Sequence, residues 1–130
     1  MTAAQDLTEA YQEWRRLAEA EGEAIRLCNW SLVAACQTAL QNLQERITRL
    51  SPAARDEWAK RGPRGIAERK TLNAAVRELI QLQRRNQTLL NAICNRTRAK
   101  LEELNQAGRT LKQLRNSYGA AQSAGWSSFS

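Results

Sequence analysis

The chain contains no histidine, only two prolines and few aromatic residues. Histidine is the commonest general base and a frequent metal ligand, so its absence removes the usual means of acid–base catalysis and zinc binding. Valine and isoleucine are scarce, which disfavours strands. No run approaches the ~18 apolar residues that a membrane span needs. We therefore expect a protein that is not an enzyme and has no cofactor, no metal and no membrane insertion.

The three cysteines, Cys28, Cys36 and Cys94, are an odd number without CxxC spacing. We expect reduced thiols that serve as small core residues in a cytoplasmic protein. The opening segment, MTAAQDLTEA, has neither the basic nor the apolar stretch of a secretory signal, which also favours the cytoplasm.

Alanine, leucine, glutamine, arginine and glutamate dominate the chain, a composition typical of long helices. Apolar residues recur at steps of three and four from Leu7 to Leu50, interrupted at Glu21, and their phase shifts by one residue near Ala35. A straight helix drifts by ~20° per heptad against a seven-residue repeat. The shift therefore predicts one nearly straight helix over about residues 4–50.

Ser51 and Pro52 are expected to end that helix, because proline cannot continue it and disfavours helical geometry in the preceding residue. A short connector helix is predicted at about 52–61, followed by a break at 61–65. A second long helix is predicted over about 66–118. Its apolar stripe includes the polar residues Gln83, Asn86 and Thr97, which either set helix register or mark where a partner approaches.

Two helices of similar length joined by a short connector pack antiparallel. The sequence thus predicts an all-α fold, an elongated antiparallel hairpin or bundle of two long helices, as a single domain over residues 1–118 with a flexible tail at 119–130. Such a hairpin leaves apolar surface for a homodimer or another partner. Trp14 is expected in the core, whereas Trp30 and Trp58 could belong to the core or to an interface.

Charge is unevenly distributed between the two halves. Residues 1–50 contain five arginines against seven acids, a balance of −2, and residues 51–130 contain fifteen basic residues against six acids, a balance of +9. One interpretation is a basic helical nucleic-acid-binding protein. It is less favoured, because Arg85, Arg96 and Arg109 fan around the helix. The favoured interpretation is a solvated basic face opposite the acids of the first helix.

Several segments resemble one family of helical proteins. The first predicted helix carries W-x-x-L-x-x-x-E from Trp14, A-I-x-x-x-N-W from Ala24 and L-Q-N-L from Leu40. The second carries L-I-Q-L-Q-R-R-N-Q-x-L-L from Leu79 and ends in L-R-N-S-Y-G from Leu114. These segments resemble the FlgN family of flagellar export chaperones. A secreted hairpin of the WXG type is disfavoured, because the connector has no Trp-x-Gly.

The resemblance implies a cytoplasmic chaperone that binds the C-terminal helices of hook–filament junction proteins, which are flagellar hook-associated proteins, and delivers them to the export apparatus. It places substrate binding in the C-terminal half of the chain. The residues implied there are Leu79, Leu82, Asn86, Leu89, Leu90 and Ile93. Docking on the export gate would fall to Tyr118, and the tail leaves open whether Trp126 and Phe129 also take part.

Overall fold

The computed structural model describes the backbone of residues 2–129 and the side chains of residues 2–119. Within this range the chain forms three helices and no strand, so the all-helical prediction is confirmed and the prediction of two long helices is wrong. Contacts divide the chain into two units, Met1–Leu90 and Asn91–Ser130, where a single domain through residue 118 was expected.

The first helix, α1, spans Ala3–Arg26, and two sets of hydrogen bonds cap its N-terminus. Thr2 and Gln5 form a capping box, in which each side chain accepts from the other residue's backbone N–H. The Glu57 carboxylate accepts from the N–H groups of Ala3 and Ala4 at 2.9 and 3.0 Å. A carboxylate at this position also complements the positive end of the helix dipole. The start of α1 is thereby tied to the last turns of α2.

The predicted continuous helix over 4–50 is broken by a turn at 27–29. Cys28 adopts a left-handed φ of 53°, and the N–H of Asn29 donates to the Ala24 carbonyl at 2.9 Å, as in a Schellman turn. Asn29 then caps the next helix by accepting from the Leu32 N–H at 3.3 Å. The phase shift in the apolar pattern therefore reflects the change from α1 to the next helix. The prediction of one nearly straight helix is wrong.

The second helix, α2, spans Trp30–Arg61 and contains Pro52 in its interior. The predicted end at Ser51 and the separate connector helix at 52–61 are therefore wrong. Proline inside a helix costs about 3 kcal/mol, because one hydrogen bond is lost and the ring crowds the preceding turn. The helix continues because core residues lie on both sides of the proline, with Ile47 before it and Ala54 and Trp58 after it.

The predicted break after Arg61 is confirmed but is only one residue long. Gly62 has a φ of 64°, a left-handed conformation that glycine adopts without strain. The third helix, α3, begins at Pro63, three residues before the predicted start, and its backbone continues to Phe129 beyond the predicted stop at Gly119. A glycine inside a helix costs only about 1 kcal/mol and need not end it. The mobility of residues 119–130 stays a prediction.

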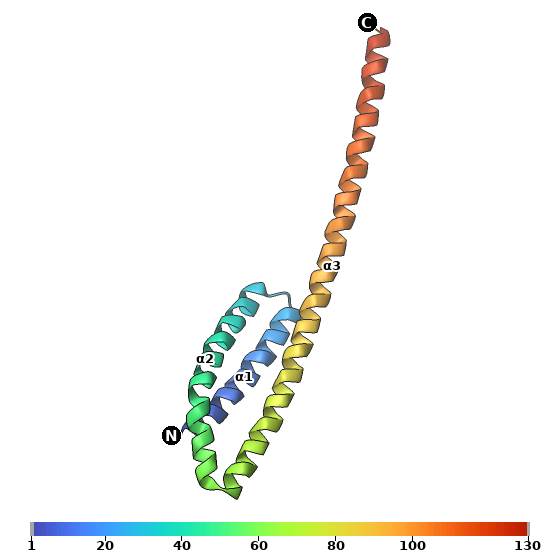
Figure 1. Ribbon diagram of the computed structural model, residues 1–130. Helices are drawn as coiled ribbons and strands as arrows, with labels where there is room; N and C mark the ends of the chain where they lie inside the picture. Colours follow the sequence, from blue (N-terminus) through green and yellow to red (C-terminus); the bar gives the residue numbers. More distant parts are fainter. Residues whose placement is uncertain (1, 130) are drawn as a thin grey trace. The chain divides into compact units, whose positions relative to one another are not determined.

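The first unit consists of α1, α2 and the part of α3 up to Leu90, with successive helices running in opposite directions (Figure 1). Its core joins Leu7 and Leu17 of α1 with Leu43 of α2 and Leu72 of α3. Gly65 of α3 is buried, and a Cβ there would collide with the Trp58 carbonyl of α2. These two helices therefore approach closely beside the turn at Gly62. Arg61 pairs with Glu68 across this turn.

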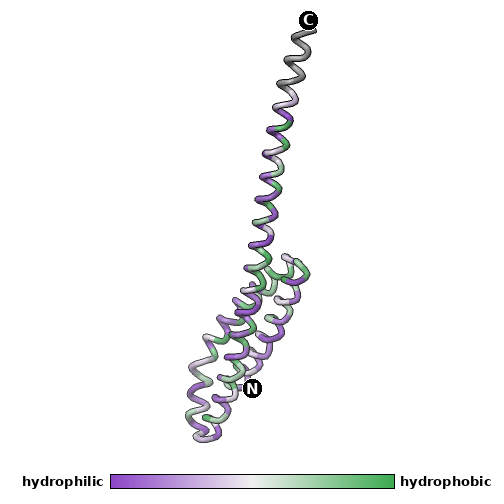
Figure 2. The backbone as a smooth tube through the Cα atoms, turned by 90° about the vertical axis from the view of Figure 1, so that its right-hand side faces the viewer, coloured by the Kyte–Doolittle hydropathy of each residue, from purple (hydrophilic) through white to green (hydrophobic). Residues whose placement is uncertain are grey.

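The second unit contains the remainder of α3, described through the side chain of Gly119. All its described side chains from Cys94 onward are exposed. Figure 2 shows hydrophobic residues recurring at intervals along this segment. Over the described part of the chain, no helix is both long and apolar enough to cross a bilayer.

Candidate functional site

The second unit presents an apolar stripe, defined here as Leu101, Leu104, Leu111, Leu114 and Tyr118. Each of these side chains is between 53% and 70% exposed. At about 100° per residue they fall within one face roughly 140° wide. Helices that bury an apolar face in a core show the same spacing of apolar residues. The stripe therefore has the sequence pattern of a buried face, although its side chains are exposed.

Basic residues share this face. At about 100° per residue, Lys100 and Arg115 lie within about 40° of Leu104, whereas Glu102 lies about 160° away and Glu103 lies at the edge of the face, about 20° from Leu114. Over residues 91–119 there are six basic residues and two acids, a balance of +4. None of the six forms an ion pair with a residue that the structure describes. The stripe is therefore both apolar and electropositive.

Among the described residues, no ion pair joins a basic residue of α3 to an acid of α1. The ion pair that joins these helices has the opposite polarity, with Arg15 of α1 lying 3.6 Å from Glu78 of α3. The acids Glu13, Glu19 and Glu23 of α1 pair instead with arginines on their own helix. Neighbours three and four residues apart on one helix are close enough to pair without any tertiary contact.

The residues implied by the family resemblance fall into three classes of exposure. Leu79 and Asn86 are buried in the first unit, so little of either side chain is available to a partner. Four others are half-buried: Leu82, Leu89, Leu90 and Ile93. Tyr118 is 70% exposed. The family resemblance implied substrate binding at residues 79–93, whereas the exposed large apolar side chains of the second unit lie farther along α3, from Leu101 to Tyr118.

The tryptophans differ in role. Trp58 is buried in the core cluster and Trp14 packs against that cluster, as expected for Trp14. Trp30 is 46% exposed at the start of α2. Trp126 and Phe129 lie outside the residues whose side chains the structure describes.

Of the three cysteines, only Cys36 is buried. Cys28 is exposed because it lies in the turn between α1 and α2, and Cys94 is exposed in the second unit.

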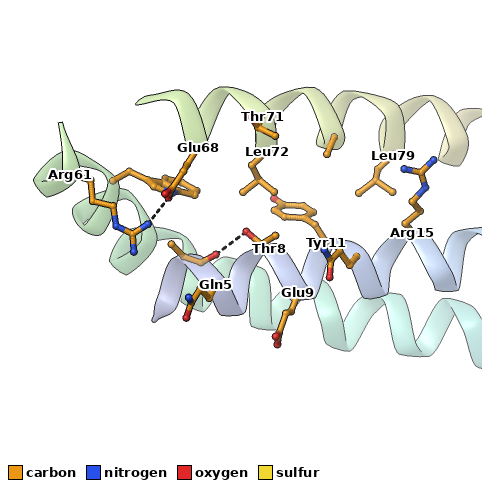
Figure 3. Close-up of a pocket in the computed structure, with 14 residues that line it drawn as sticks. Gln5, Thr8, Glu9, Tyr11, Arg15, Arg61, Glu68, Thr71, Leu72 and Leu79 are labelled. Carbon is orange, nitrogen blue, oxygen red and sulfur yellow. Dashed lines mark hydrogen bonds and ion pairs between the residues drawn. The ribbon is translucent and has the colours of Figure 1, made fainter. Parts of the chain in front are cut away.

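A groove of about 850 Å³ runs between α1 and α3 (Figure 3). Trp58 of α2 also lines it. Leu72 and Leu79 point from α3 toward α1, from which Tyr11 points back. Burial raises the pKa of Tyr11, and the charge of Arg55 partly opposes this. The Tyr11 and Trp14 rings of α1 lie 6.5 Å apart.

Two polar side chains meet in the interior of the first unit. Glu21 interrupts the apolar series of α1, and Asn86 interrupts that of α3, and the structure brings them together. Asn86 Nδ2 donates to the Ala18 carbonyl at 2.7 Å and to Glu21 Oε1 at 3.2 Å. Each residue was visible in the sequence as a break in a stripe, but nothing local paired them. Among the described residues, no three potential metal ligands gather in one place.

Comparisons with models of protein families, with curated proteins and with solved structures found no match for this chain.

Proposed function

We propose that the protein is a chaperone that binds an amphipathic helix of another protein through the apolar stripe of its second unit. The observation that carries this proposal is the exposure of the five stripe residues at helical spacing. A solvent-exposed stripe of this kind is what a helix presents when its partner belongs to another chain. No catalytic function is needed to account for it.

The size of the stripe indicates the affinity to expect. Burying a leucine fully contributes about 1.5–3 kcal/mol. Because these side chains are already partly covered, each contributes roughly 1–2 kcal/mol, or about 5–10 kcal/mol together. A micromolar dissociation constant corresponds to about 8 kcal/mol, and association itself has a cost. We therefore expect micromolar or weaker binding from the stripe alone.

Charge indicates the kind of partner. Lys100 and Arg115 lie on the stripe, so a partner helix flanked by aspartate or glutamate would form charge-assisted contacts there. A second copy would bring these like charges together, which disfavours a homodimer through this face. The partner in this proposal is therefore an acidic amphipathic helix of a different protein.

The resemblance to the flagellar export chaperones supports a narrower proposal. In it, the partner is the C-terminal helix of a hook–filament junction protein, held unassembled in the cytoplasm until export. Tyr118, at the end of the stripe, would then contact the export gate.

The experiment is calorimetric titration with the C-terminal segment of a cognate junction protein. The double variant Leu104→Glu/Leu111→Glu should weaken binding at least tenfold. The matched control, Gln106→Glu/Gln113→Glu, adds the same two charges about 160–180° from Leu104 and should bind like the wild type. Absence of binding by the wild type, or equal weakening in both variants, would contradict the proposal.

Nucleic-acid binding is the second candidate, favoured by the six basic residues of the second unit, none of which forms an ion pair with a described residue. It predicts affinity for duplex or single strands that falls steeply with salt. The same variants separate the two candidates. Both lower the net charge by two, so a nucleic-acid binder should lose affinity equally in each, whereas a helix binder should lose it only when the stripe is altered.

A further inference from the structure

Glu21 is a buried carboxylate for which the described part of the chain supplies no counter-charge. It is 5% exposed, and one oxygen, Oε1, accepts from Asn86. No lysine or arginine among residues 2–119 lies within ion-pair distance of it. Buried carboxylates are normally paired with a cation or several donors, because burial removes their hydration. Glu21 therefore has capacity for one more partner, and a cation would satisfy it best.

A pocket of about 270 Å³ gives access to this carboxylate. All three helices of the first unit line it, with Glu21 and Trp14 from α1, Leu40 and Gln41 from α2, and Leu90 from α3. Leucines and the indole ring offer apolar walls, and side-chain amides stand among them. This combination suits a group with an aliphatic stem and a charged end.

Trp14 provides a second and independent sign of a missing partner. Its indole Nε1 is buried and has no hydrogen-bond acceptor among the described residues. Buried indole N–H groups usually find an acceptor. The same ring can also stabilise a cation placed over its face. Both residues line the pocket, and the indole N–H has no acceptor among the described residues.

We propose that this pocket binds a guanidinium or alkylammonium group on an aliphatic stem, with its charge paired with Glu21 and the carbonyl at the other end of the stem accepting from Trp14 Nε1. An arginine or lysine residue with flanking amides has this chemistry, and so does the free amino acid. The proposal concerns the first unit alone and does not depend on what the stripe of the second unit binds.

The experiment follows the indole N–H resonances of the full chain by NMR during titration with N-acetyl-arginine amide. The Trp14 resonance, assigned with Trp14→Phe, should shift in a saturable way. N-acetyl-citrulline amide has the same shape without the charge and should bind at least tenfold more weakly. Titration with free arginine distinguishes a small-molecule site from a site for an arginine residue within a chain. In free arginine, charged ammonium and carboxylate groups replace the flanking amides, so a site for a residue within a chain should bind it more weakly than N-acetyl-arginine amide.

Two variants test the role of Glu21. Glu21→Gln keeps an acceptor for Asn86 and should weaken binding at least tenfold. Glu23→Gln removes a charge from an exposed position on the same helix and should bind like the wild type. Lack of any saturable shift in the wild type, or equal binding by Glu21→Gln, would overturn the proposal.

If Glu21→Gln does not fold, Gln41→Arg decides the question. It places a guanidinium at the wall of the pocket, tethered to α2. We expect a higher unfolding temperature and no remaining titration, because the chain then supplies its own cation. An unchanged unfolding temperature with unchanged ligand binding would overturn the proposal.

Discussion

Asn86 Nδ2 on α3 donates to Glu21 Oε1 on α1 at 3.2 Å, with the two side chains 3% and 5% exposed. The same nitrogen donates to the Ala18 carbonyl at 2.7 Å. This pairing fixes how far α3 can slide along α1, because a shift of one residue would leave both buried groups unsatisfied. Asn86 thus sets register, one of the two roles that its position in the stripe suggested.

Asn86→Ala should destabilise the first unit by about 2 kcal/mol, because it leaves Glu21 and the Ala18 carbonyl without their donor. Urea unfolding followed by circular dichroism measures this. Asn73→Ala, at an exposed position on the same helix, is the control and should change stability by less than about 0.5 kcal/mol. Equal effects of the two substitutions would show that the buried pair adds nothing.

Gly22→Ala should destabilise the protein although alanine is the better helix former. The new Cβ would lie 2.7 Å from Asn86 Oδ1, so the amide held by two hydrogen bonds has to move. We expect a net loss of about 1 kcal/mol, since hydrogen-bond loss exceeds the gain in helix propensity. In an Asn86→Ala background the same substitution should become neutral or stabilising.

Gly108→Ala is the matched comparison in the second unit. A Cβ there meets nothing within 4 Å. The substitution should raise the helical signal in circular dichroism, because alanine is favoured over glycine by up to about 1 kcal/mol. A loss of helicity would mean that Gly108 lies against a surface in solution.

Glu57 should make stability depend on pH in the acid range. Its hydrogen bond from the Ala4 N–H is the largest effect on its pKa, and with the Ala3 N–H and nearby Arg61 it lowers that pKa below 4.5, although desolvation opposes this. A lowered folded-state pKa stabilises the protein above the unfolded pKa, and this stabilisation is lost as pH falls through the folded one.

Glu57→Gln should therefore lower the unfolding temperature at pH 7, and the difference from wild type should shrink below about pH 4.5. Glu45→Gln, at an exposed position of α2, is the control. A difference that stays constant between pH 7 and pH 3 would rule out the carboxylate cap.

The cysteines should react with iodoacetamide at different rates in the folded protein. Cys28 and Cys94 are exposed, whereas Cys36 is buried. Burial, and then the charge of Glu21, raise the pKa of the Cys36 thiol, which lowers its thiolate fraction. Mass spectrometry should find two rapid alkylations and a third only after denaturation. Rapid triple labelling without denaturant would contradict the packing of Cys36.

Tyr118→Ala should leave folding unchanged, because the side chain is 70% exposed. Under the export-chaperone proposal it should impair delivery of the partner to the export gate, measured as secreted junction protein. A fall in unfolding temperature would show instead that Tyr118 packs against the protein.

The sequence by itself determined the helical class, the break after Arg61 and most of the core of α2. These features depend on local properties: the three-and-four spacing of apolar residues, and the conformations that Gly62 and Pro63 allow. The stripe at 101–118 was equally visible. Its exposure was not, because periodicity shows that a face is apolar but not whether anything covers it.

Only the tertiary structure decided where the first predicted helix breaks and why Pro52 does not break the second. The left-handed Cys28 and the internal proline are locally unfavourable, and packing between segments far apart in the chain offsets their cost. The pairing of Glu21 with Asn86, 65 residues later, was undetermined for the same reason. A polar residue in an apolar stripe signals that a partner is needed, but the identity of that partner depends on how the helices come together.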